Sequence, residues 1–312
     1  MAAENEKPLL SIDEQIAHMQ RQGIKFDICS VDEAKDYLAN HNNYFRTRSY
    51  RTGFLRHESG INNGKFISLD FAALKGLASI DESLRYTLLL MALDIEHQVK
   101  MLILKAVHES GEDGYLIVQD YLMEKSSDSK SSLSKEISVY GKSIYCDGAL
   151  ERYKENPPIW VFLEFLSFGK LTYFSQFVAK RCSDKILEEV YYHLLAIRLL
   201  RNACAHSSCV INDLKSHSAG HRTRSTVSQA LIEIGMGHKM RTRRMANERI
   251  RQIATLLFTH QLLIKDGASR KRVQIQLHKV YTEINQREAL YSHNPPTQAF
   301  FDFFGILVDE WY

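Results

Sequence analysis

Residues 80–109 carry the sequence IDESLRYTLLLMALDIEHQVKMLILKAVHE, and this stretch decides the fold class. Apolar or small side chains recur in it at steps of three or four residues, the spacing that keeps them on one face of an α-helix. They are Ile80, Leu84, Leu88, Met91, Ile95, Val99, Leu102 and Ala106. Ser79 and Glu82 have the spacing of a capping box, so we expect the helix to begin at Ile80. One apolar face sustained for about eight turns predicts the central helix of a bundle.

The rest of the chain also favours helices over strands. Only 5 prolines and 15 glycines interrupt its 312 residues. Helical patterns cover residues 11–22, 31–40, 185–206, 227–235 and 245–264, and two short helices are expected between Pro157 and Phe177. Residues 57–65 predict a loop or small hairpin, and the Ser- and Lys-rich residues 124–138 predict a mobile loop or frayed helix. The predicted fold class is therefore all-α.

The composition is that of an ordinary soluble globular protein, with 45% apolar and 25% charged residues. No stretch approaches the roughly 20 uncharged apolar residues of a membrane span. The N-terminal residues MAAENEKPLL lack an apolar signal core, so we expect a cytoplasmic protein without membrane contact. The five cysteines include no CxxC pair and are odd in number, which indicates reduced thiols rather than a disulfide framework or a zinc ribbon. The aromatic stretch at residues 299–312 is expected to pack on the body or on a partner chain.

The net charge of +3 conceals an uneven distribution of charge. Residues 181–280 contain 18 Lys and Arg but 7 Asp and Glu, a net charge of +11, so the rest of the chain carries −8. A basic segment of this kind suits a polyanionic partner such as nucleic acid. A solvated helix face has the same composition and is the alternative interpretation.

A motif at the end of the predicted helix 185–206 has the side chains of a phosphodiester-cleaving site, Arg201-Asn202-Ala203-Cys204-Ala205-His206. At about 100° per residue, Asn202 and His206 lie one turn apart and continue the apolar stripe of Leu199. Arg201 continues the apolar stripe beside it, where a charge needs a partner or a wet cleft. Arg presents a planar fork to phosphate oxygens, and His moves protons near neutral pH. A structural Arg beside a core His also fits this spacing.

The order of four boxes along residues 8–212 resembles the Abi family of abortive-infection proteins, in its AbiD/AbiF-like group. The first box is Asn42-Asn43-Tyr44-Phe45-Arg46 with Ser49-Tyr50, similar to the family's NYYR-x-x-x-Y. The second comprises Asp81, Leu84-Arg85 and Ile95-Glu96 on the long helix. The third comprises Pro157-Pro158-Ile159-Trp160, Glu164 and Ser167-Phe168-Gly169. The fourth is the motif from Arg201 to His206, similar to the Arg-x4-His signature of the HEPN superfamily.

The resemblance implies a HEPN-like helical bundle with an N-terminal helical extension and a C-terminal helical segment. We place the core at residues 76–265, the extension at 1–75 and the C-terminal segment at 266–312. The resemblance also implies a homodimer in which two motifs form one composite active site. Its implied activity is metal-independent cleavage of RNA without a cofactor, in phage defence or as a toxin restrained by an antitoxin. A small non-coding RNA accompanies some members, so RNA is the expected partner.

Arg201, Asn202 and His206 are the predicted catalytic residues. The RNA 2′-OH is expected to attack the adjacent phosphorus, with His206 as general base or phosphate ligand. Arg201 is expected to stabilise charge on the phosphoryl oxygens, and Asn202 to orient His206 or the ribose. Basic residues that follow the motif are predicted to contact RNA phosphates, namely Lys215, Arg222, Arg224, Lys239, Arg241, Arg243 and Arg244.

Other interpretations stay open on the sequence alone. His217 and His221 are four residues apart, but no third ligand stands nearby, so no metal site is predicted. The same bundle can bind RNA or a partner protein without cutting, or serve as a scaffold that has no role with nucleic acid. Arg85 and Glu96, three turns apart on the long helix, are predicted to be structural rather than catalytic.

Overall fold

The computed structural model describes residues 9–126, 152–153, 155–215 and 217–312. Within these residues the secondary structure consists of α-helices and short 3₁₀ turns, with two isolated β-bridges and no β-strand. The predicted all-α fold class is therefore confirmed. Of the predicted Ser- and Lys-rich loop, residues 127–138 lie outside the described residues.

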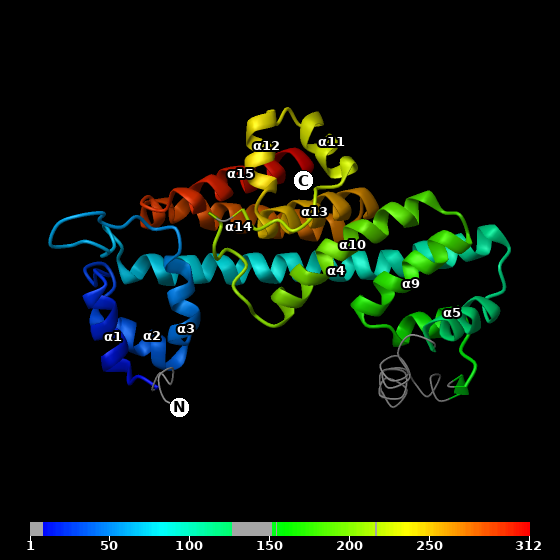
Figure 1. Cartoon of the computed structure of the whole chain (residues 1–312), viewed down its shortest axis with the longest axis horizontal. Coiled ribbons are helices and arrows are strands. Elements are labelled where there is room, and N and C mark those ends of the chain that lie inside the picture. Colours follow the sequence, from blue (N-terminus) through cyan, green and yellow to red (C-terminus); the bar gives the residue numbers. More distant parts are fainter. Residues whose placement is uncertain (1–8, 127–151, 154, 216) are drawn as a thin grey trace, which may run out of the picture.

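The longest element is α4, Phe71–Ser110, whose 40 residues extend about 60 Å along the length of the molecule (Figure 1). Seven of the eight residues of the predicted apolar stripe are buried, and Leu102 is half-buried. The helices that pack most extensively against α4 are α9 (Phe168–Arg181), α10 (Lys185–Ala205), α13 (Glu248–Leu263) and α14 (Ala268–Gln286). The prediction of a central bundle helix is thus confirmed.

The predicted beginning of this helix at Ile80 is wrong. The helix begins at Phe71, after Asp70, whose side chain accepts a hydrogen bond from the Ala72 N–H at 2.8 Å. Ser79 is not a cap, because its hydroxyl donates to Glu283 Oε1 on α14 at 2.6 Å. The apolar residues before it are buried, so the helix extends back through them. The domain boundary predicted after residue 75 falls within the second turn of α4.

Two groups of shorter helices lie at the two ends of α4 (Figure 1). At one end are α1 (Ile12–Arg21), α2 (Val31–Asn40), α3 (Tyr44–Thr47) and the 3₁₀ helix η1 (Arg48–Arg51). At the other end are α5 (Leu116–Ser126), α8 (Ile159–Phe162), η3 (Leu163–Phe165) and α9. Asp70 connects the first group to α4, because its carboxylate also accepts hydrogen bonds from the N–H groups of Asp27 and Ile28.

The C-terminal half adds a layer along α4 (Figure 1). After α11 (Ser225–Glu233) and α12 (His238–Met245) come α13, α14, the 3₁₀ helix η4 (Glu288–Tyr291) and α15 (Pro295–Trp311). The aromatic side chains of α15 are buried, and α15 contacts α13 and α14, so this stretch packs on the body of its own chain. None of the described helices has the length and apolar content that crossing a bilayer requires.

Candidate functional site

Arg201 lies in the last turns of α10 and faces Glu96 of α4. Its Nη2 atom is 3.8 Å from Glu96 Oε2, and its side chain is 28% exposed. The guanidinium group also lies over the ring of Phe168, the first residue of α9, 5.9 Å from the ring centroid. Residues from the second, third and fourth boxes therefore meet around one cation.

The ion pair between Glu96 and Arg201 is long and lacks a hydrogen bond. Burial raises the pKa of Glu96, and the positive charges of Arg201 and Lys100 oppose this rise. Neither Glu96 Oε2 nor Arg201 Nε has a hydrogen-bond partner among the described residues. The carboxylate therefore holds the guanidinium by charge without a well-directed hydrogen bond. The Nε atom that lacks a partner is itself buried, while the Arg201 side chain as a whole is 28% exposed.

Glu96 is the site residue that the sequence reasoning missed. The sequence predicts a structural role for Glu96 together with Arg85, three turns away on the same side of the long helix. In the structure the two residues have different partners, because Arg85 pairs with Asp81 and Glu96 pairs with Arg201. No signal in the sequence separates Glu96 from Arg85, because each stands in the second box next to a residue of the predicted apolar stripe, Ile95 and Leu84 respectively.

Asp81 holds the chain that follows the motif. Its Oδ1 atom accepts hydrogen bonds from the N–H groups of Val210 at 2.8 Å and Ile211 at 3.1 Å. Its Oδ2 atom accepts from Arg85 Nε at 2.8 Å and from the Tyr50 hydroxyl at 3.1 Å. Burial, together with the Asp81 charge, raises the pKa of Tyr50, so this phenol keeps its proton and donates it to the carboxylate. The first box, the second box and the segment after the motif thus meet at one buried side chain.

Asn202 and His206 lie on the exposed side of α10. The expectation that they continue a buried stripe is wrong, because Leu199 on that stripe is 53% exposed. The face of α10 that packs on α4, α9 and α13 carries Leu194, Ile197, Leu200 and Cys204 instead. The two polar side chains therefore reach solvent at the edge of this packed face.

The end of α10 fixes the position of His206. His206 is the C-cap residue, and its N–H donates to the Asn202 carbonyl at 2.9 Å. Ser207 follows in the left-handed region with φ of 55°, and the Ser208 N–H donates to the Ala203 carbonyl at 2.8 Å. This arrangement is a Schellman-type helix end. Arg201 Nη1 lies 3.5 Å from Asn202 Oδ1, so the guanidinium and the amide are neighbours, and His206 follows one turn later.

The sequence profile of a family described as Abi-like protein matches residues 37–212, more than half of the chain. This chain belongs to the Abi-like protein family. The matched region contains Tyr50, Asp81, Glu96 and the whole motif, which are the residues that the structure connects. Neither a curated protein nor a solved structure matches the sequence significantly.

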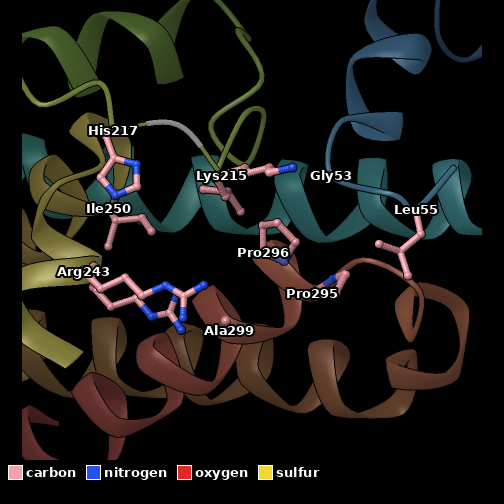
Figure 2. Close-up of a pocket in the computed structure, with 11 residues that line it drawn as sticks. Gly53, Leu55, Lys215, His217, Arg243, Ile250, Pro295, Pro296 and Ala299 are labelled. Carbon is pink, nitrogen blue, oxygen red and sulfur yellow. The ribbon is translucent and has the colours of Figure 1, made fainter. Parts of the chain in front are cut away.

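The predicted RNA-contacting residues of this Abi-like protein divide into separate groups. Lys215, Arg243 and Arg244 line one pocket (Figure 2), and Arg222 and Arg241 line a second. Lys239 is exposed outside both linings. Arg224 differs, because two of its nitrogens donate to the carboxylate of Glu189, whose pKa this contact lowers. Its charge is therefore balanced within the chain, while the other six lack such a bidentate partner among the described residues.

The two cysteines beside His206 are protonated by burial, and the two histidines that follow the motif lie apart. The described residues contain no group of three or more His, Cys, Asp or Glu side chains placed to hold a metal ion. His217 and His221 line different pockets. Burial raises the pKa of Cys204 to about 12 and also raises that of Cys209, so both thiols stay protonated at neutral pH and are poor nucleophiles.

Proposed function

We propose that this Abi-like protein is a metal-independent endoribonuclease of the HEPN type, acting in phage defence by abortive infection or in a toxin–antitoxin system. The observation that carries the proposal is the state of the motif side chains. Arg201 is held by Glu96 at 3.8 Å and stays 28% exposed, and Asn202 and His206 are exposed on the same two helical turns. A purely structural Arg and His would instead be packed and fully hydrogen-bonded.

The chemistry follows from these groups. The ribose 2′ oxygen attacks the adjacent phosphorus and the bond from phosphorus to the 5′ oxygen breaks, which leaves a 2′,3′-cyclic phosphate and a 5′-OH. His206 takes the proton of the 2′-OH or hydrogen-bonds the phosphate, and the leaving 5′ oxygen receives a proton. Arg201 stabilises the charge that grows on the phosphoryl oxygens, and Asn202 orients His206 or the ribose.

A homodimer completes the site in this proposal. The exposed Leu199 lies on the same helix side as Asn202 and His206, which gives an apolar contact beside the polar groups. In a twofold dimer the same surface patch of each chain faces the other, so two copies of the motif meet in one groove. An antitoxin that covers this groove, or a small RNA that occupies it, would restrain the activity.

The test compares Arg201→Ala and His206→Ala with the parent protein on RNA. We expect each substitution to slow cleavage by roughly 100-fold or more. Arg198→Ala is the matched control, because Arg198 lies one turn earlier on α10 and contacts Tyr173 of α9 instead of the motif. RNA with a 2′-deoxyribose at the cut position should resist cleavage. Equal rates for the parent and both motif variants, or cutting of the deoxy substrate, would refute the proposal.

The second candidate is an RNA-binding module that does not cut. It is favoured by the position of the predicted RNA contacts, since neither basic pocket is lined by a motif residue. In that case RNA copurifies with the protein and dissociates steeply with salt, and Arg201→Ala changes neither the RNA ends nor their yield.

A further inference from the structure

A basic pocket lies away from the motif, where four segments distant in sequence come together (Figure 2). Its volume is about 440 Å³, within the range of small-molecule sites. Its walls come from the loop after η1, the segment before α11, the α12–α13 region and the first turns of α15. Its basic side chains are Lys215, His217, Arg243 and Arg244.

The charge of this pocket is not balanced within its walls. None of the described residues that line it is Asp or Glu. Lys215 and Arg243 form no ion pair with any described residue. Burial and the charge of Arg243 lower the pKa of Arg244, and the exposed Asp302 opposes this only in part. Like charges gathered at a half-buried surface repel one another, and a bound anion relieves that repulsion.

Other arginines of this chain show what a balanced site looks like. Arg224 is bonded by Glu189, Arg251 by Glu248, and Arg181 by both Glu112 and Asp120. In each case the chain supplies the carboxylate. The basic pocket lacks this arrangement although it gathers more cations, which indicates that the anion comes from a ligand.

The remaining walls are apolar. They consist of Gly53, Leu55, Leu214, Ile250, Pro295, Pro296 and Ala299. In Figure 2 His217 and Arg243 lie on one side of the pocket, and Leu55 and Pro295 lie on the opposite side. A ligand that fits both sides has a compact anionic group joined to a flat, largely apolar ring. A nucleotide with a terminal phosphate has this form.

We propose that this pocket binds a phosphorylated nucleotide, with the phosphate against Arg243 and Arg244, and the nucleoside against Leu55, Pro295 and Pro296 beside Lys215. Either a free nucleoside monophosphate or the 5′-phosphorylated end of an RNA presents this chemistry. The inference deepens the proposed RNA-binding role of these three basic residues. It does not depend on cleavage, because no motif residue lines the pocket.

The experiment measures binding on full-length protein that carries His206→Ala, so that RNA stays intact. The probes are adenosine 5′-monophosphate, adenosine, and a ten-nucleotide RNA with either a 5′-phosphate or a 5′-OH. We expect at least one phosphorylated probe to bind roughly tenfold or more tightly than its unphosphorylated form. A free nucleotide is the ligand if the monophosphate itself binds and displaces the RNA. An RNA end is the ligand if the 5′-phosphate matters only in the RNA.

Three variants connect this binding to the pocket. Arg243→Gln should weaken it roughly 10- to 100-fold, whereas Lys265→Gln, which removes an exposed charge outside the lining, should leave it unchanged. Ala299→Phe should weaken it as well, because it fills the pocket and alters no charge. Circular dichroism melting confirms that each variant is folded. Equal binding with and without phosphate, or equal loss in Arg243→Gln and Lys265→Gln, would overturn the proposal. Cleavage is measured separately with Arg243→Gln in protein that retains His206, and an unchanged rate there would leave the nuclease proposal intact.

Discussion

Two acidic residues of α4, Asp81 and Glu96, pair with arginines, and the two pairs differ in the hydrogen bonds that they form. The Asp81 carboxylate is fully buried and accepts four hydrogen bonds, among them one from Arg85 at 2.8 Å. The Glu96 carboxylate approaches Arg201 only to 3.8 Å, and one of its oxygens has no hydrogen-bond partner among the described residues. Both acids come from the same box, yet one completes a structural junction and the other leaves an arginine partly free.

The two pairs therefore serve different purposes: the Asp81–Arg85 pair stabilises the fold, and the Glu96–Arg201 pair belongs to the candidate site. A carboxylate with every lone pair used holds neighbouring segments in one arrangement and has nothing left for a ligand. A loosely paired arginine at the edge of a helix interface keeps donors that can move to a phosphate. Asp81 therefore fixes the chain beyond His206, and Glu96 keeps Arg201 positioned and available.

Breaking the Asp81 junction should have the largest effect. Asp81→Ala removes the acceptor of two backbone N–H groups and leaves the Arg85 charge buried without a partner. We expect a loss of about 3–5 kcal/mol in the free energy of unfolding, measured by urea titration. Tyr50→Phe is the control that removes one hydrogen bond of the same junction and should cost only about 1 kcal/mol. A loss below that of Tyr50→Phe would show that the junction is not structural.

Double-mutant cycles sharpen the same comparison. The coupling energy between Asp81 and Arg85 should amount to several kcal/mol, because each buried partner is left uncompensated without the other. The coupling between Glu96 and Arg201 should stay below about 1 kcal/mol, because the pair is partly exposed and poorly directed. Neutral substitutions to Gln and Asn, followed by urea unfolding, measure both. A stronger Glu96–Arg201 coupling would make Arg201 structural and weaken the nuclease proposal.

The pH dependence of the free energy of unfolding should report the titration of Glu96. Burial raises its pKa, so the folded state holds this proton to higher pH than the unfolded chain does. The stability that this group contributes is present below its ordinary pKa and is lost as the pH rises through the raised value. Glu96→Gln does not titrate, so its unfolding free energy relative to the parent should increase from pH 4 towards neutrality. The change should be larger in an Arg201→Gln background, since Arg201 opposes the rise in pKa, and a flat difference would contradict the assignment.

The sequence predicted most of the helices that carry apolar faces and the motif at the end of α10, but not α5, although Ile117, Val118 and Tyr121 of that helix are buried. It missed α12, whose residues HKMRTRRM bury only Met245 and therefore show no apolar period. It also misjudged the beginning of α4, because Ser79 and Glu82 match a capping box while Asp70 is the actual cap. The apolar period of a helix shows which of its residues are buried, but it does not show which of two capping residues is used. That choice depends on contacts remote in sequence, since Asp70 bonds the loop between α1 and α2 and Ser79 bonds α14.

The candidate site was predictable only in part for a similar reason. The motif is contiguous in sequence, so Arg201, Asn202 and His206 could be selected together. The partner of Arg201 lies more than a hundred residues away, and no local pattern distinguishes Glu96 from Arg85. The helix face that carries Leu199 has the sequence pattern of a buried stripe. An exposed apolar residue such as Leu199 cannot be told from a buried one by the sequence alone.

The smallest effect concerns Ser207, the residue between the exposed His206 and the segment that Asp81 holds. Its φ of 55° lies in the left-handed region, where a side chain is strained and glycine is not. Ser207→Gly should therefore raise the free energy of unfolding by about 0.5 kcal/mol, because the relief of strain exceeds the added entropy of the unfolded chain. Ser183 has the same conformation after α9, with φ of 53°, so Ser183→Gly is a matched control distant from the motif in sequence.

If the end of α10 positions His206, Ser207→Val should lower RNA cleavage while Ser183→Val, equally strained, should not. Equal cleavage by the two Val variants would mean that His206 acts without this helix end.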